Sequence, residues 1–285
     1  MNRQTKQPIG TAPGGIVRGS NQSGVRAHNE RLVLSLVRQN GPLAKSEIAR
    51  RTGLSAQAVS VIMRGLEADG LLEKCEPVRG RVGQPSVPMG LAPGGAYFLG
   101  MKVGRRSLDL ILIDFVGQVI DRIHHTHRYP DPDGVVDFAR RSIDAMLARL
   151  APEQLSRVAG LGIAMPFYFW AWAKTLGVAQ ADMDPWRERD IAAEIGANLP
   201  FPVYLQNDAT SACSAELLFG TGERPPDFVH LFVGFFIGGG IVLNNCLFVG
   251  SNGNAGAFGP LPVATRGERV TQLIDVASLA SLERA

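Results

Sequence analysis

Residues 45–72, KSEIARRTGLSAQAVSVIMRGLEADGLL, predict two short helices joined by a tight turn at Gly53 and Leu54. Ser55 stands at the start of the second helix, where its hydroxyl oxygen can accept a hydrogen bond from an unpaired amide of the first turn. Gly70 stands where a glycine commonly ends a helix. One face of the second helix is apolar, because hydrophobic residues recur at helical spacing; they are Val59, Ile62, Met63 and Leu66. The stretch is therefore predicted to be a helix-turn-helix, whose second helix fits the major groove of DNA.

The opposite face of the second predicted helix is polar. It carries Gln57, Ser60 and Arg64, none of which is a carboxylate. Side chains of this kind suit the hydrogen-bonding edges of base pairs. We expect these three residues to contact DNA, together with Ser46 and Ser55 at the starts of the two helices.

Two short strands are predicted to follow the helices, at 71–76 and 86–91, around the loop VRGRVGQP. Such a β-hairpin "wing" would place Arg79, Arg81 and Gln84 at its tip, where they can reach phosphates or an adjacent minor groove. A loop rich in Gly and Arg can equally be a plain solvated turn. Its position directly after a helix-turn-helix favours contact with DNA.

The charge of the chain is unevenly distributed. The first 90 residues carry 13 Lys and Arg against 6 Asp and Glu, whereas the remaining 195 carry 16 against 20. A basic N-terminal third beside a mildly acidic remainder is typical of a DNA-reading module fused to another domain. No apolar run is long enough for a membrane span, so no membrane partner is expected. The three scattered cysteines predict neither a disulfide framework nor a metal site, and they fit a reducing cytoplasm.

Length and composition predict two folded domains after a disordered arm. Residues 1–24 are rich in Gly, Pro, Gln, Asn and Ser and form the expected arm. A winged helix-turn-helix is expected over 25–92, with a first helix from about Val25 to Gln39, and a second domain over 93–285. Strand-like and helical runs alternate in this second domain, which indicates an α/β fold. The predicted strands are 97–103, 107–115, 118–125, 158–164 and 203–206, the predicted helices are 133–150, 188–198 and 209–219, and a hairpin is predicted from 228–235 and 240–248 around a glycine run.

Three motifs of the second domain occur in a familiar order: FPVYLQNDATSACSAE at 201–216, IGGGIVLNN at 237–245 and GSNGNAGAFG at 250–259. With the preceding strand-turn-strand pattern, they resemble the ROK family of repressors, open reading frames and kinases. The resemblance implies an actin-like (ribonuclease H-like) fold of two α/β lobes with a ligand cleft between them. Here the first lobe would span about 93–205, and an incomplete second lobe about 206–285. Family members continue beyond this point, so we expect the incomplete lobe to leave apolar surface uncovered. Either the chain is truncated, or a partner subunit covers this surface.

Both phosphate loops that the resemblance predicts depart from the kinase pattern. The first reads MKVGRRS at 101–107, with Lys102 at the acidic position and Arg105 and Arg106 where smaller residues let phosphate approach. The second reads GFFIGGG at 234–240, with Phe235 and Phe236 in place of a hydroxyl and a glycine. We therefore expect neither ATP as a cofactor nor sugar kinase activity. Zinc is not expected either, because residues 261–275 lack the family's cysteine-rich loop.

The sugar side of the resemblance is partly retained. It implies effector contacts by Asn207, Asp208, Gly239, Asn254 and Gly256, whereas a sugar-binding Glu and a His of the family are replaced by Ala257 and Pro260. Asp208 can alternatively cap the helix that follows it. Aromatic residues in the segment PFYFWAW, 166–172, can stack on a sugar ring, fill space left by lost polar ligands, or pack between subunits.

Together these features predict a cytoplasmic, homodimeric transcriptional regulator that binds a double-stranded operator and represses carbohydrate genes. The expected effector is a sugar or sugar derivative. Two alternatives remain open at this point: a sugar kinase with a DNA-binding appendage, and a constitutive DNA binder whose second domain senses nothing.

Overall fold

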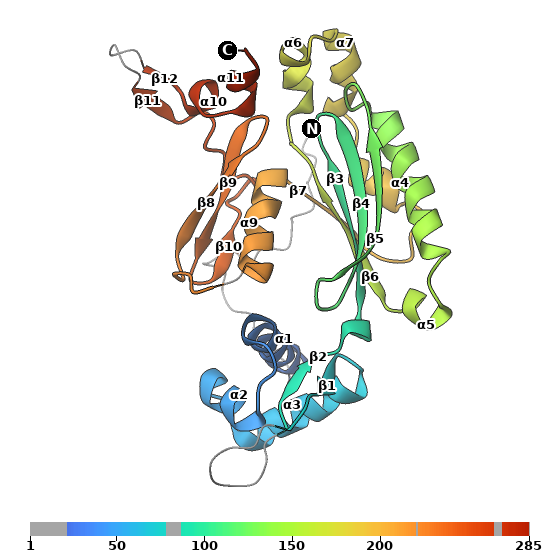
Figure 1. The fold of residues 1–285 in the computed structure, drawn as a ribbon, viewed down its shortest axis with the longest axis vertical. Helices are drawn as coiled ribbons and strands as arrows, with labels where there is room; N and C mark the ends of the chain where they lie inside the picture. The colour runs from blue at the N-terminus through green and yellow to red at the C-terminus, as the bar shows by residue number, and fades with distance from the viewer. Residues whose placement is uncertain (1–21, 78–86, 221, 265–269, 285) are drawn as a thin grey trace.

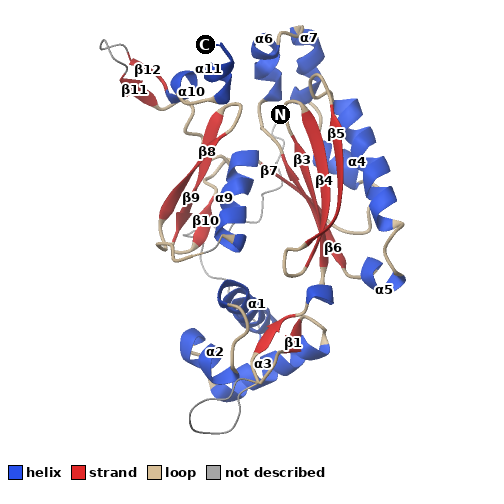
Figure 2. Cartoon of the chain, in the orientation of Figure 1, coloured by secondary structure: helices blue, strands red, loops and turns tan. Residues whose placement is uncertain are grey.

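The computed structural model describes residues 22–77, 87–220, 222–264 and 270–284. Figure 1 shows a helical region at one end of the molecule, formed by residues 22–77 and 87–91, and two separate sheets beyond it. We name these sheets the large sheet (β3–β7) and the small sheet (β8–β10). The fold is α/β, as predicted, with an N-terminal winged helix-turn-helix (Figure 2).

The helical region comprises α1 (Gln22–Asn40), α2 (Lys45–Thr52), α3 (Ala56–Ala68) and a hairpin of β1 (Leu72–Lys74) with β2 (Met89–Leu91). The predicted helix-turn-helix is confirmed, and α1 begins slightly before the expected Val25. Gly53 ends α2 with a positive φ of 71°, and Gly70 follows α3 with a φ of 72°. These backbone angles favour glycine at both positions. The core of the region consists of Val33, Val37, Ile48, Val59, Ile62, Met63, Leu66, Leu72 and Met89.

The large sheet has the order β5-β4-β3-β6-β7 among the described residues. Its strands are β3 (Tyr97–Val103), β4 (Ser107–Asp114), β5 (Val119–Thr126), β6 (Val158–Ala164) and β7 (Val203–Gln206). β3 pairs antiparallel with β4 and parallel with β6, so the sheet is mixed. It is covered by α4 (Pro132–Leu147), with α5 (Pro152–Leu155), α6 (Ala173–Leu176), α7 (Gln180–Met183) and α8 (Ile191–Gly196) around it. The strands follow the predicted runs because buried and half-buried residues alternate along β4, as on a sheet covered mainly on one face.

The small sheet has the order β10-β9-β8 in the part of the chain that is described. It is formed by β8 (Phe228–Val233), β9 (Ile237–Leu243) and β10 (Cys246–Phe248), and α9 (Asp208–Phe219) packs on it. The predicted hairpin is present, since β8 pairs antiparallel with β9, but the prediction that it turns at the glycine run was wrong, because Gly238, Gly239 and Gly240 lie inside β9. The chain instead turns at 234–236 and again at Asn244 and Asn245, whose φ angles of 52° and 58° suit a tight hairpin.

Beyond the small sheet lie β11 (Pro262–Ala264), β12 (Val270–Gln272), α10 (Leu273–Val276) and α11 (Leu279–Arg284). Along β8, Val229, Leu231 and Val233 alternate with inward residues and are each more than half exposed. This is the uncovered apolar surface expected from the sequence. None of the helices in the described residues is long and apolar enough to cross a membrane.

Candidate DNA interface and effector site

The outer face of α3 carries exposed polar side chains. Gln57 and Arg64 are exposed, whereas Ser60 is half-buried. The guanidinium Nε of Arg64 donates to the carbonyl of Ser60 at 3.2 Å, which leaves its other donors free to reach a ligand. The hydroxyl of Ser55 accepts from the amide of Ala58 at 3.1 Å and so caps the helix. Gln57 and Arg64 therefore form the candidate DNA-reading face, which we call the reading face, and Ser55 fixes where the helix begins.

A residue of this face was missed by sequence reasoning. Val61 is 52% exposed, although it is apolar. It lies four residues after Gln57 and three before Arg64, so the three side chains share one face of α3. The spacing is present in the sequence, but an apolar residue on a polar face does not by itself predict contact with DNA.

Two arginines of α2 share one carboxylate. Arg50 and Arg51 both bind the carboxylate of Glu47, and these hydrogen bonds lower the pKa of Glu47 to about 2. Part of the positive charge of α2 is therefore compensated. Ser46 is exposed on the same helix. The predicted wing contacts Arg79, Arg81 and Gln84 lie outside the described residues.

The candidate effector residues meet at the start of α9. Asn207, not Asp208, is the N-cap: its side-chain oxygen accepts from the amides of Ala209 at 3.0 Å and Thr210 at 3.2 Å. The amide nitrogen of Asn207 remains as a donor for a ligand. Asp208 is the first residue of the helix, and its Oδ1 also accepts from the Ala209 amide. The pair thus offers one donor and one acceptor, the combination that neighbouring sugar hydroxyls require.

Burial raises the pKa of the Asp208 carboxyl above its usual range, while the Ala209 amide and the charge of Lys102 act to lower it. Lys102 occupies β3, so a basic residue of the large sheet faces the acid of α9.

Asp208→Asn is expected to raise the free energy of unfolding at pH 7. Because the pKa of Asp208 is raised by folding, the folded chain holds its proton to a higher pH than the unfolded chain. Stability from this group is therefore lost as the pH rises from the unfolded pKa through the folded one. Asparagine does not ionise, so the advantage of the variant should shrink toward about pH 4. Urea denaturation at several pH values measures this, and a variant that is less stable at pH 7 would contradict it.

The two candidate glycines are places of close backbone approach. A Cβ on Gly256 would lie 2.0 Å from the carbonyl oxygen of Gly239, and a Cβ on Gly239 would lie 2.1 Å from that of His230. The neighbouring Gly238 faces Ala209 of α9. Asn254 is half-buried, and its carbonyl accepts from the amide of Ala257. The glycines therefore bring the 250–259 loop and β9 against the start of α9.

The two loops that resemble phosphate loops contact each other. The guanidinium of Arg105 lies 4.0 Å from the ring centroid of Phe235, and it pairs with Glu283 of α11 at 2.7 Å. Trp172 meets Phe236 edge to face, with centroids 4.8 Å apart. Phe169, in the same aromatic segment, is fully buried in the core of the large sheet. Of the three roles considered for this segment, filling space fits Phe169 and Trp172.

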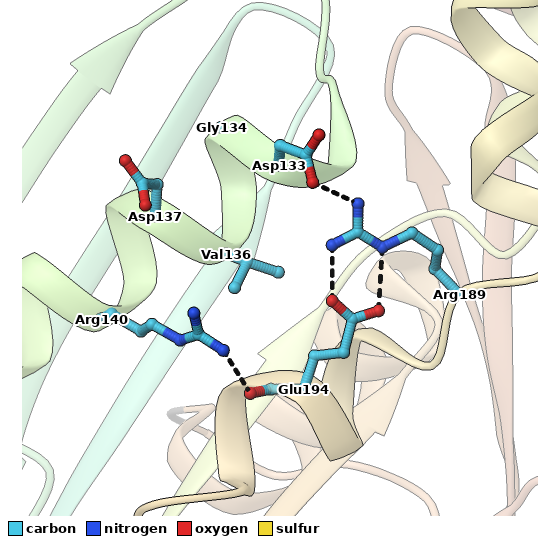
Figure 3. A pocket seen from close by; sticks show the side chains of 7 residues that line it. All are labelled: Asp133, Gly134, Val136, Asp137, Arg140, Arg189 and Glu194. Atoms are coloured by element: carbon cyan, nitrogen blue, oxygen red, sulfur yellow. Dashed lines mark hydrogen bonds and ion pairs between the residues drawn. The ribbon is translucent and has the colours of Figure 1, made fainter.

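A polar hollow between α4 and α8 is a weaker candidate for a site (Figure 3). Arg189 there binds both Asp133 and Glu194, while Arg140 donates to the backbone carbonyl of Glu194. These mutual ion pairs satisfy the charges and join the two helices.

One contact connects all three regions of the molecule. Arg38 of α1 donates to the carbonyl of Phe115, in the turn between β4 and β5, at 2.5 Å. Its guanidinium lies 5.2 Å from the ring centroid of Phe115 and 5.7 Å from that of Phe219, at the end of α9. Arg38 is therefore shared by the helix-turn-helix, the large sheet and α9, the helix capped by Asn207.

Comparison with known proteins gives two family matches. The ROK family matches residues 98–271, and the MarR family matches residues 26–81. Among curated relatives, the xylose repressor of Bacillus spizizenii is 24% identical over 250 residues, covering 88% of this chain and 64% of the relative. The DNA-binding transcriptional dual regulator NagC of Escherichia coli is 23% identical, covering 90% of this chain and 63% of the relative. The chain thus spans a little under two thirds of the length of these relatives.

Solved structures agree on the fold. A ROK family transcriptional regulator described as a homolog of the E. coli MLC protein has a TM-score of 0.63 at 22% identity, covering 91% of this chain and 67% of that one. A ROK family glucokinase from Streptomyces griseus, in complex with glucose and AMPPNP, has a TM-score of 0.50 at 26% identity, covering 66% and 59%. Since the family match includes more than half of its residues, the chain belongs to the ROK family.

Proposed function

We propose that the chain is a sequence-specific DNA-binding regulator, a repressor of carbohydrate genes, with a sugar-like effector held in its ROK domain. Residues 25–92 would bind DNA and residues 93–285 the effector. The observation that carries the proposal is the outer face of α3, where Gln57 and Arg64 are exposed on a capped helix. Relatives of this chain that bear the names xylose repressor and N-acetylglucosamine repressor support it. Action on an operator places the protein in the cytoplasm.

A homodimer is part of the proposal. One helix-turn-helix reads only a few base pairs, and dimers gain specificity by reading two half-sites about one helical turn apart. The DNA contacts proposed are Ser46, Ser55, Gln57, Ser60 and Arg64 of the helices, with Arg79, Arg81 and Gln84 of the 78–85 loop.

Kinase activity is not part of the proposal. A phosphoryl-transfer site needs backbone amides close to the phosphates and a carboxylate to organise magnesium. Here Arg105 stacks on Phe235 between the two loops, and Lys102 stands at the acidic position.

The proposal is tested by selecting duplexes from a random DNA pool with the purified full chain. We expect a consensus sequence with two related half-sites, bound more tightly than random duplex at 150 mM salt. D-xylose and N-acetylglucosamine are then added, and we expect one of them to weaken binding and to raise the midpoint of thermal unfolding. Failure to select any duplex would refute DNA binding. Selection without any response to sugars would favour the constitutive binder.

Arg38→Ala is expected to remove the effect of sugar binding on the affinity for DNA. Because Arg38 contacts both Phe115 and Phe219, movement of α9 can reach α1 through it. The variant should still bind the selected duplex and still be stabilised by the sugar, but the sugar should no longer change its duplex affinity. Arg38→Lys keeps the charge without the planar fork and should respond partially. Duplex titrations with and without sugar measure this, and an undiminished response in Arg38→Ala would exclude this route.

A further inference from the structure

Val61 of α3 does not belong to the buried core of the helix-turn-helix. The core side of the helix is supplied by Val59, Ile62, Met63 and Leu66, all buried, whereas Val61 is 52% exposed. Valine is also a poorer helix former than alanine or the long polar residues, because its branched Cβ is restricted in a helix. Neither packing nor helix propensity therefore accounts for a valine at this site.

The neighbours of Val61 define what it faces. Gln57 and Arg64 stand on either side of it on the reading face, and both carry hydrogen-bonding groups toward solvent. If the proposed function is correct, these side chains enter the major groove, where glutamine forms paired hydrogen bonds with adenine and arginine with guanine. A side chain between them would meet a base-pair edge at the same depth.

Only one natural group on the unmodified base edges of the major groove is apolar, the C5-methyl of thymine. A valine offers no hydrogen bond, so against any other base it would leave polar groups without partners. Its stiff side chain also loses little rotamer freedom on contact. Val61 also lines a hollow between α3 and α1, together with Val25 and Ile62, and this hollow extends the apolar surface on the α1 side of the helix.

We propose that Val61 reads the C5-methyl group of a thymine and so requires an A·T pair between the base pairs contacted by Gln57 and Arg64. The inference rests on the proposed function and adds to it a specificity-determining residue. It predicts a thymine at a fixed place in each half-site of the selected duplex.

The test replaces each thymine of the selected duplex in turn by deoxyuridine, which removes only the methyl group. Wild type, Val61→Ala and Val25→Ala are titrated against each duplex by fluorescence anisotropy. Val25 is the matched control, because it is an exposed valine (45%) lining the same hollow from α1. Circular dichroism checks that each variant is folded.

We expect one thymine per half-site whose replacement weakens wild-type binding about three- to tenfold, the effect of one lost apolar contact. Val61→Ala should bind both duplexes equally, and Val25→Ala should behave as wild type. If no thymine is sensed by wild type and ignored by Val61→Ala, the inference is overturned while DNA binding stands. An equal loss of sensitivity in Val25→Ala would also overturn it, since the hollow as a whole would then be responsible. Absence of any selected duplex would instead refute the proposed function itself.

Discussion

The double variant in which alanine replaces both Gln57 and Arg64 is expected to bind the selected duplex about a hundredfold or more weakly. Each bidentate contact to a base edge contributes about 1–3 kcal/mol. Both side chains are exposed and neither belongs to the buried core of the helix-turn-helix, so folding should be unaffected. Affinity for random duplex should fall far less, since it depends on phosphates. Fluorescence anisotropy with both duplexes across a salt series measures the difference.

The control for this variant is Arg141→Ala, which removes one exposed arginine from α4, a helix that covers the large sheet. It changes the net charge without changing the reading face, and its affinity should stay within about twofold of wild type. If the double variant loses equal affinity for selected and random duplex, Gln57 and Arg64 contact the backbone instead of the bases. If it loses none, α3 is not the recognition helix.

The helix-turn-helix could be predicted from the sequence because several local signals agree. The apolar stripe of α3, the cap at Ser55 and the positive-φ positions of Gly53 and Gly70 all occur within one short segment. Much of the large sheet was predictable for the same reason, since alternation along β4 specifies a covered face without reference to distant residues.

Features that depend on distant contacts were not predictable in this way. The glycine run reads as a turn by composition, but it lies in β9 because Gly240 must pass close to Cys213 of α9. Arg105 and Phe235 are far apart in sequence. In the sequence, each residue indicates only that its own loop differs from a kinase phosphate loop. Their mutual stacking, which closes the space between the loops, depends on tertiary structure.

The candidate effector site was predicted in position but not in chemistry. Asn207 and Asp208 differ in role because the helix begins one residue earlier than predicted, which makes Asn207 the cap. A single-residue shift of this kind is beyond what propensity can resolve. The consequence is that Asn207 offers a donor to a ligand, not an acceptor.

Gly256→Ala is expected to lower the free energy of unfolding by about 3 kcal/mol or more, because its Cβ would enter the space of two backbone groups that cannot rotate away. That Cβ would lie 2.0 Å from the carbonyl oxygen of Gly239 and 2.7 Å from the amide nitrogen of Gly240. The thermal midpoint should fall by about 5–10 °C. Since Gly240 covers Cys213, which is fully buried, native-state labelling of this thiol should also become faster.

Gly162→Ala is the matched control, since a Cβ at that strand position has no heavy atom within 4 Å. It should match wild type or gain slightly, because alanine restricts the unfolded chain more than glycine does. The comparison decides what the glycine pair does at the effector site. A large loss of stability in Gly256→Ala alone would show that Gly239 and Gly256 allow the 250–259 loop to pack closely on β9. This packing would then hold Asn207 and Asp208 in place. If Gly256→Ala is as stable as the control, the backbone there has room for a side chain, and the glycines would instead leave that room for a ligand.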